Sequence, residues 1–176
     1  VVLIGPRQVG KTSILEKTFP EYAYVTMDVS VNAEMAETRP QDFLRQFPPP
    51  VVLDEIQYAP SFLRHIKTCV DAHRHENGLF LLTGSQNFML LEAVTESLAG
   101  RAAIIPFSGL SGKEWKAAQA MYEDVSWQEF LWKGGFPGLW SSPEASPSRE
   151  RWYQGYVTTY LERDIRNLLN IGSLRD

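Results

Sequence analysis

Apolar residues occur along the first two thirds of the chain in short runs that are separated by segments with helical spacing. Four runs are almost continuously apolar, at residues 1–4, 51–53, 79–82 and 102–107. A further segment, residues 22–27, is rich in β-branched and aromatic side chains, which are typical of strands. Continuous apolar runs indicate strands that are covered on both faces. The pattern therefore predicts a parallel β-sheet with helices over both of its faces.

The segments between these strands predict helices. We expect helices at residues 11–19, 31–38, 40–46, 61–75 and 88–98. The fourth of them carries an apolar stripe at helical spacing, formed by Phe62, Ile66, Cys69 and Val70. Strands that alternate with helices predict an α/β fold, and we assign it to a first domain, residues 1–108.

The chain changes character at Ser108, where strands end and tryptophans accumulate. All tryptophans of the sequence lie beyond this point: Trp115, Trp127, Trp132, Trp140 and Trp152. We expect a helix that ends at residues 129–133, a polar loop at 141–148, and a long helix at 149–169 with an aromatic face. These elements predict an α-helical lid or connector, residues 109–176. Aromatic residues at helical spacing usually form a core, so we favour packing over a base-stacking platform.

The loop after the first apolar run has the pattern G-x-x-x-x-G-K-[ST] between a strand and a helix. It consists of Gly5, Pro6, Arg7, Gln8, Val9, Gly10, Lys11 and Thr12, and Ser13 follows it. Backbone N–H groups in such a loop point at phosphate oxygens, and the helix N-terminus adds positive potential. The lysine reaches the β- and γ-phosphates, while the threonine hydroxyl is a ligand of Mg²⁺. The motif predicts that residues 5–13 bind ATP, with Lys11 as a solvent-facing functional side chain.

A second motif follows the predicted strand 51–53, where the chain continues with Asp54 and Glu55. Open α/β sheets bind their ligands at the carboxyl ends of the strands, so we expect Asp54 and Thr12 to hold Mg²⁺ there. Magnesium needs only one or two protein carboxylates, which leaves Glu55 available as the general base for the attacking water. The acidic pair therefore favours ATP hydrolysis over binding alone.

Composition limits the function classes that remain. The 176 residues carry a formal net charge of −4 and are 44% hydrophobic, which fits one sizeable core and argues against a chain-wide nucleic-acid surface. The single cysteine, Cys69, argues against a disulfide framework and favours a cytoplasmic location. We expect no membrane partner, because no apolar stretch reaches transmembrane length. The first strand begins at Val1, so we expect a fragment of a longer protein, truncated at both ends.

Six segments, in this order, resemble a group of prokaryotic AAA+ ATPases: GPRQVGKT, VVLDEIQ, LLTGSQ, SLAGR, GGFP and YLERDI. In that group an ATPase core precedes a C-terminal domain of uncertain function that is often thought to be nuclease-like. The resemblance implies a P-loop NTPase fold in which the strand bearing Ser85 lies between the P-loop strand and the Asp54 strand.

The resemblance also implies roles for further polar residues. The residue at the tip of the central strand senses the γ-phosphate, and Ser85 fits this role best, with Thr83 second; a polar strand cap is the alternative. Arg101 lies where AAA+ proteins commonly carry an arginine finger, which acts on a neighbouring subunit and would require a homo-oligomer. A surface salt bridge is the alternative for Arg101. Arg163 or Arg166 on the last helix would be a lid sensor.

Two functions are compatible with these observations. The first is a Mg²⁺-dependent ATPase that drives or gates a C-terminal effector acting on nucleic acid or protein. Its catalytic residues would be Glu55, Lys11, Ser85 and Arg101. The second is an ATP-gated protein-interaction switch with slow or no turnover. Glu55 favours the first function, because a protein that only binds ATP needs no general base.

Overall fold

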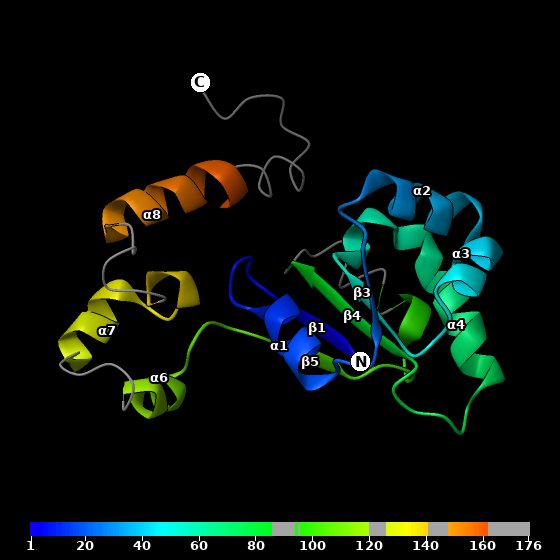
Figure 1. Cartoon of the computed structure of the whole chain (residues 1–176), viewed down its shortest axis with the longest axis horizontal. Helices are drawn as coiled ribbons and strands as arrows, with labels where there is room; N and C mark the ends of the chain where they lie inside the picture. Colours follow the sequence, from blue (N-terminus) through cyan, green and yellow to red (C-terminus); the bar gives the residue numbers. More distant parts are fainter. Residues whose placement is uncertain (86–93, 95, 120–125, 141–147, 162–176) are drawn as a thin grey trace. The chain divides into compact units, whose positions relative to one another are not determined.

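The computed structural model describes residues 1–85, 94, 96–119, 126–140 and 148–161 (Figure 1). The chain divides into two compact units. The first consists of Val1–Gly5 and Lys11–Phe107, and the second of Pro6–Gly10 and Ser108–Asp176. The loop between Gly5 and Lys11 therefore groups with the C-terminal part of the chain.

The first unit is built on a five-stranded sheet with the strand order β2-β3-β4-β1-β5. The strands are β1 (Val2–Gly5), β2 (Ala23–Thr26), β3 (Val51–Asp54), β4 (Phe80–Ser85) and β5 (Ile104–Pro106). All four pairings between neighbouring strands are parallel. Strand β4, which ends at Ser85, lies between β1 and β3, so the expected strand order is confirmed.

Alternate residues of the three central strands, β1, β3 and β4, belong to two separate hydrophobic clusters, because successive side chains point to opposite faces of a sheet. In β1, Val2 and Ile4 belong to the larger cluster, whereas Leu3 belongs to the smaller one. Strand β3 repeats this division, with Val52 in the smaller cluster. Burial on both faces thus explains the apolar runs of β1, β3 and β4, whereas the run at 102–107 forms the edge strand β5, whose residues are exposed.

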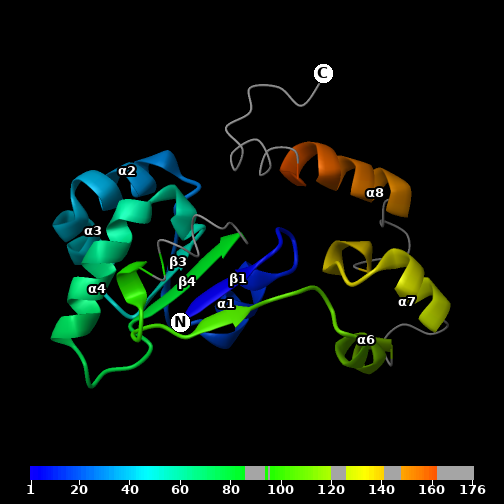
Figure 2. The same cartoon turned by 180° about the vertical axis from the view of Figure 1, so that it is seen from behind.

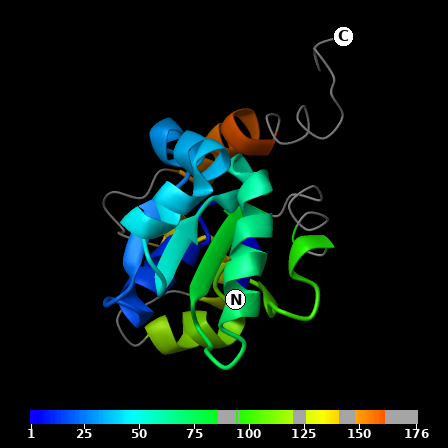
Figure 3. The same cartoon turned by 90° about the vertical axis from the view of Figure 1, so that its right-hand side faces the viewer.

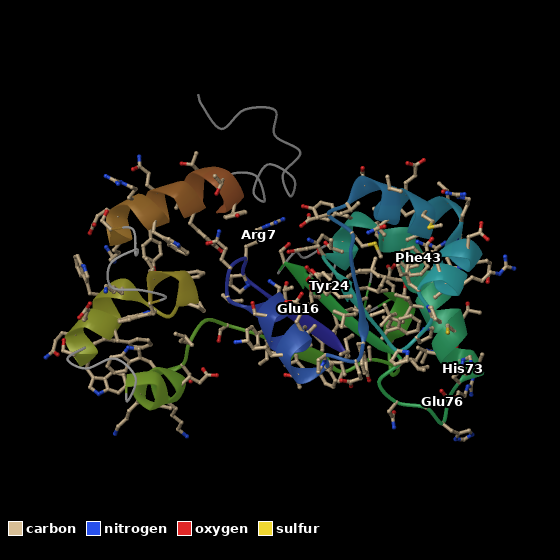
Figure 4. All side chains as sticks on the ribbon, viewed as in Figure 1. Arg7, Glu16, Tyr24, Phe43, His73 and Glu76 are labelled. Atoms are coloured by element: carbon tan, nitrogen blue, oxygen red, sulfur yellow. The ribbon has the colours of Figure 1, made fainter. Side chains whose placement is uncertain are left out.

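Helices cover both faces, as the sequence pattern predicts. Helix α1 (Lys11–Thr18) contributes Leu15 to the smaller cluster. The larger cluster is covered by α2 (Ser30–Thr38), α3 (Pro40–Gln46) and α4 (Leu63–Ala72). Phe43 of α3, labelled in Figure 4, packs edge-on against Phe62 with 4.9 Å between ring centroids. Figures 1 and 2 show α1 on one side of the sheet and α2–α4 on the other, and Figure 3 is viewed from the α2–α4 side.

Several element boundaries differ from the expected ones. The predicted helix 61–75 is shorter, because two 3₁₀ turns, Ile56–Tyr58 and Pro60–Phe62, precede α4 and helical geometry ends at Ala72. Cys69, which belongs to the expected stripe, is only partly buried. The predicted helix 88–98 lies mostly outside the described residues, although Val94 and Leu98 are buried in the larger cluster.

The second unit contains short helices and clustered aromatic rings. Its elements are α6 (Gly112–Gln119), α7 (Trp127–Lys133), a 3₁₀ turn (Pro137–Leu139), α8 (Arg149–Tyr156) and a π-helical segment (Val157–Leu161). Helix α6 was not predicted from the sequence. The expected helix 149–169 has α-helical geometry only to Tyr156, and its part beyond Leu161 lies outside the described residues, as do Arg163, Arg166 and the loop residues 141–147.

The aromatic residues of the second unit pack mainly against one another. Trp115 is 3% exposed and lies with its ring centroid 4.7 Å from that of Trp127 and 4.9 Å from that of Phe130. On α8, Trp152 stacks on Tyr156 at 5.2 Å with an interplanar angle of 16°. Trp115 is therefore a core residue, whereas α8 has no buried residue, and a packing role for its aromatic face stays a prediction.

Within the described residues, no helix combines the length and apolar character that crossing a membrane would require.

Candidate nucleotide site

Gly5 ends strand β1 at a point where the neighbouring chain comes very close. The Phe107 N–H donates to the Ile4 carbonyl oxygen at 2.6 Å, directly after β5. A Cβ atom on residue 5 would overlap the Phe107 carbonyl group. The first glycine of the motif is therefore needed for strand packing, in addition to the phosphate-binding role that the sequence suggests.

The remainder of the loop depends on left-handed backbone geometry. Gln8 has a φ of 61° and Gly10 a φ of 96°. A Cβ on residue 10 would meet no atom within 4 Å, so the glycine is required there by its torsion angle and not by space. The chain then enters α1 at Lys11, where the N–H groups of the first helical turn lack partners within the helix. Such N–H groups form an anion site.

Lys11 corrects one expectation from the sequence. Its side chain is 5% exposed and does not face solvent, and its Nζ donates to the Gly5 carbonyl oxygen at 3.0 Å. That carbonyl, six residues earlier in the chain, provides the hydrogen-bond acceptor that a buried ammonium group needs. The ammonium group is nevertheless held at the loop that would bind phosphate.

The carboxylate of Asp54 lies at the end of β3 and accepts hydrogen bonds from three hydroxyl groups. Thr12 Oγ1 lies 3.2 Å from both Asp54 Oδ1 and Oδ2. Thr83 Oγ1 donates to Oδ1, and Tyr24 Oη donates to Oδ2 at 2.5 Å. Asp54 is only 6% exposed, so these donors replace most of its hydration. The structure thus brings together the two residues that the sequence assigns to Mg²⁺.

Tyr24 was not identified from the sequence, although strand register explains its place. It is opposite Val52 in the parallel pairing of β2 with β3, and Asp54 follows two residues later on the same face as Val52. Figure 4 labels Tyr24. Partial burial raises the pKa of the Tyr24 phenol well above its ordinary value, and the hydrogen bond to Asp54 adds to this. Tyr24 therefore remains a proton donor to the carboxylate at neutral pH.

Glu55 has an unusual backbone conformation directly after Asp54. Its φ of 55° and ψ of 46° lie in the left-handed region, which is uncommon for a residue with a side chain. Its N–H donates to Thr83 Oγ1 at 3.1 Å, and its Oε2 accepts a hydrogen bond from Gln57 Nε2. The Oε1 atom of Gln57 is buried and has no hydrogen-bond partner among the described residues. Gln57 was not identified from the sequence either.

Thr83 and Ser85 both lie on β4, but their surroundings differ. The Thr83 hydroxyl connects the two acidic residues, because it donates to Asp54 and accepts from the Glu55 N–H. Ser85 is 5% exposed and lies beside Gly5 in the pairing of β4 with β1. Thr83 is thus part of the acidic cluster, and Ser85 lies next to the start of the loop.

Arg101 lies at the other end of the sheet. It precedes β5, whose first residue, Ile104, pairs with Val2 at the start of β1. Its Nε donates to Asp71 Oδ1 at 2.7 Å, and this hydrogen bond lowers the pKa of the Asp71 carboxyl below its usual range. Arg101 thus lies at the amino ends of the strands, whereas Asp54 lies at their carboxyl ends. Since β1 spans four residues, these two ends of the sheet are about 10 Å apart. Arg101 is therefore not close to the nucleotide site of its own chain.

The other loop residues differ in exposure and contacts. Val9 is 4% exposed, whereas Ser13 is exposed on α1. Within the second unit, Gln8 Nε2 donates to Tyr160 Oη at 3.1 Å, and the Arg7 guanidinium lies 5.3 Å from the centre of the Tyr160 ring. Figure 4 labels Arg7.

The donor set around Asp54 suits magnesium. A carboxylate and a threonine hydroxyl are hard oxygen ligands, and Mg²⁺ is bound in proteins through one or two carboxylates completed by phosphate and water oxygens. The Thr12 hydroxyl can donate a hydrogen bond to Asp54, and its oxygen lone pairs remain available to bind a cation. The residues present therefore fit a magnesium–nucleotide complex.

Known proteins were compared with the chain by sequence and by structure. Two uncharacterized proteins, from Mycobacterium bovis and Mycobacterium tuberculosis, are each 30% identical to the chain over 172 residues. The match covers 96% of the chain but only 36% of each relative, so the chain spans about a third of their length. A solved sugar kinase from Janibacter sp. HTCC2649, unliganded, covers 92% of both chains at 14% identity, with a TM-score of 0.33, which is too low to indicate a shared fold.

Two family models match different parts of the chain. Residues 124–175 match a domain of unknown function, DUF8612. Residues 1–116, which include the loop, Asp54, Thr83 and Arg101, match the family described as AAA domain. Because that match covers well over half of the 176 residues, this protein belongs to the AAA domain family.

Proposed function

We propose that the protein binds ATP with Mg²⁺ and hydrolyses it. The observation that carries the proposal is the convergence of Thr12, Asp54 and Thr83 at the carboxyl end of the sheet. The three residues come from α1, β3 and β4. Open parallel sheets bind their ligands at the carboxyl ends of the strands. The loop with Lys11 at its end supports the phosphate part of the site.

Each residue would have a separate task in this reaction. The backbone of residues 5–13 and the Lys11 ammonium would bind the phosphates, and Thr12 and Asp54 would hold Mg²⁺. When bound, the cation neutralises charge on the phosphate oxygens. Ser85 beside Gly5 would contact the γ-phosphate, with Thr83 as the second choice.

Glu55 would act as the general base. It follows Asp54 directly, and its N–H is anchored on the Thr83 hydroxyl, so its carboxylate starts from a fixed backbone position. A left-handed backbone at a residue with a side chain costs about 1–3 kcal/mol and persists where surrounding contacts enforce it. Such strain is often found at functional sites, which supports a catalytic role for Glu55.

A second candidate, an ATP-gated interaction switch with slow turnover, is supported by one specific contact. Gln57 Nε2 donates to the Glu55 carboxylate, which uses one of the oxygens that a general base needs for water. An enzyme whose base is occupied in this way would turn over slowly until Gln57 moves. Turnover with and without a nucleic-acid or protein partner separates this function from a constitutive ATPase.

The effector would lie in the part of the longer relatives that this chain does not cover. The chain matches only 36% of each mycobacterial protein, which leaves room for further domains in those relatives. We infer that the nucleotide cycle drives or gates such an effector, and that Arg101 would reach a nucleotide only in another copy of the chain.

The experiment that tests the proposed function compares wild type with Glu55→Gln. ATP binding is measured by calorimetry, and phosphate release is measured in the same buffer with Mg²⁺. We expect Glu55→Gln to retain ATP affinity and to lose hydrolysis by about 100-fold or more, because the amide cannot accept the proton. Equal rates for the two proteins would remove Glu55 from the mechanism and leave the switch as the better description.

A further inference from the structure

Tyr24 contacts the carboxylate on which the proposed magnesium site depends, although it belongs to neither sequence motif. Its hydroxyl donates to Asp54 Oδ2 at 2.5 Å, closer than Thr12 Oγ1, which lies 3.2 Å from the same oxygen. The two residues lie on neighbouring strands, and the register of β2 with β3 places both on the face covered by α1. The contact therefore follows from the backbone of the sheet and does not depend on a loop.

The three hydroxyl donors contact different oxygens of the Asp54 carboxylate. Thr83 donates to Oδ1 and Tyr24 to Oδ2, so each oxygen has a partner that comes from a strand. Thr12 lies 3.2 Å from both oxygens. Two strand-borne donors on opposite oxygens fix the plane of the carboxylate, and Thr12 of α1 faces both oxygens. Tyr24 is thus one of two anchors that set the orientation of Asp54.

We propose that Tyr24 is a positioning residue for the magnesium carboxylate: it holds Asp54 in the orientation that binds the cation beside Thr12. This inference rests on the proposed Mg-ATP function. Thr83 cannot provide the orientation alone, because its hydroxyl also accepts from the Glu55 N–H and anchors only one carboxylate oxygen. Without the Tyr24 hydroxyl, Oδ2 of a nearly buried carboxylate loses its closest donor, and the group can rotate.

The effect should appear in cation affinity and leave nucleotide affinity unchanged. Outer partners that orient metal ligands typically change metal affinity by about 10- to 100-fold when they are removed. The Tyr24 hydroxyl donates to Asp54, so we expect its loss to change Mg²⁺ binding and to leave ATP binding in the absence of Mg²⁺ unchanged. A residue that only supports the fold would instead change the melting temperature without changing the Mg²⁺ midpoint.

The test uses Tyr24→Phe, which removes one oxygen atom from a side chain that is 38% exposed. A non-hydrolysable ATP analogue is held at a saturating concentration, and Mg²⁺ is titrated while the melting temperature is recorded. We expect the Mg²⁺ concentration for half-maximal stabilisation to rise at least tenfold in Tyr24→Phe. The affinity for the analogue in EDTA should stay at the wild-type value. An unchanged Mg²⁺ midpoint would overturn the proposal.

Three further variants make the result specific. Tyr22→Phe is the matched control, because Tyr22 lies two residues earlier and packs on Phe19 at 5.1 Å; it should keep the wild-type midpoint. Tyr24→Leu should shift the midpoint as much as Tyr24→Phe does. A shift in the leucine variant alone would assign the effect to the ring and overturn the proposal. In an Asp54→Asn background, Tyr24→Phe should add no shift, because its effect passes through Asp54.

Failure of the proposed function would look different from failure of this inference. If wild type does not bind the analogue, or binds it equally well after Lys11→Met, the nucleotide site itself is wrong. If wild type binds the analogue in a Mg²⁺-dependent way and Tyr24→Phe does not alter that dependence, only the role of Tyr24 is wrong.

Discussion

The Thr12 hydroxyl lies 3.2 Å from both oxygens of the Asp54 carboxylate, although the two residues are separated by 42 positions in the sequence. Thr12 lies in the first turn of α1 and Asp54 ends β3, so the contact joins a helix to a strand that lies two positions from β1 in the sheet. The two motifs that the sequence suggests are therefore parts of one site.

Lys11→Met should abolish tight ATP binding without unfolding the protein. Methionine keeps the aliphatic part of a side chain that is 5% exposed, and it removes a buried charge that is costly to desolvate. We expect the free energy of unfolding to fall by no more than about 3 kcal/mol, because the lost hydrogen bond to Gly5 has a charged donor, whereas the cost of burying that charge is removed as well. Calorimetric titration with ATP and urea denaturation check both parts, and an unchanged ATP affinity would contradict the assignment.

Parts of this site could be predicted from the sequence because local patterns carry them. The loop and the acidic pair are contiguous motifs, and their chemistry requires a strand end and a helix start. The burial of Lys11 could not be predicted in this way, since it depends on the direction of the Lys11 side chain, which reaches the Gly5 carbonyl. Likewise, Tyr24 is identified only by the register of β2 with β3, which a single sequence does not encode locally.

The second unit was harder to predict for a related reason. Helix α6 is short, and its stability comes from Trp115, which is buried against Trp127 and Phe130 of α7. Those partners lie more than ten residues away, so no periodicity within α6 reveals them.

The strand order of the first unit was expected only through the resemblance to AAA+ ATPases, and the sheet confirms it.

Gly5→Ala should destabilise the protein even without nucleotide. The new Cβ would overlap the Phe107 carbonyl, which belongs to the backbone and cannot move like a flexible side chain. We expect a loss of about 3 kcal/mol in the free energy of unfolding, as is usual for overpacking at a rigid site.

The matched control for Gly5→Ala is Gly155→Ala on α8, where a Cβ would meet no atom within 4 Å. Alanine is favoured over glycine in helices, so this variant should be neutral or gain up to about 1 kcal/mol. Chemical denaturation of both variants provides the comparison. If Gly5→Ala is as stable as wild type, the backbone at Phe107 can make room for a Cβ atom on residue 5, which would contradict the prediction.

Gln57→Ala should raise the rate of ATP hydrolysis. The Gln57 amide donates to the Glu55 carboxylate, and a hydrogen bond to a charged group is worth about 1.5–3 kcal/mol. Releasing it would free the general base, and we expect kcat to rise by about tenfold with little change in KM. A fall in kcat would indicate instead that Gln57 holds Glu55 in its active orientation.

Arg101→Ala and Asp71→Asn together distinguish an arginine finger from a structural ion pair. Both changes remove the ion pair between Arg101 and Asp71, which is partly exposed and therefore contributes little to stability. If Arg101 acts on a neighbouring copy, Arg101→Ala should lower turnover and keep ATP binding, whereas Asp71→Asn should keep turnover. Similar losses in the two variants would mean that only the ion pair matters.

A mixing experiment extends this test. Arg101→Ala can bind ATP but cannot supply a finger, whereas Lys11→Met can supply a finger but cannot bind ATP. Combining the two inactive proteins should restore part of the activity, and the activity of wild type per chain should rise with protein concentration. If mixing restores no activity, Arg101 does not act on the nucleotide of a neighbouring copy.

The most direct test of the central claim is the Mg²⁺ dependence of nucleotide binding in wild type and in Asp54→Asn. The affinity for a non-hydrolysable ATP analogue is measured by calorimetry in Mg²⁺ and in EDTA for each protein. The account predicts that Mg²⁺ tightens binding to wild type and that Asp54→Asn loses most of this gain while its affinity in EDTA is unchanged, because the amide is a poorer ligand for a hard cation. The same gain from Mg²⁺ in both proteins would contradict the account, since Asp54 and Thr12 would then not form the magnesium site.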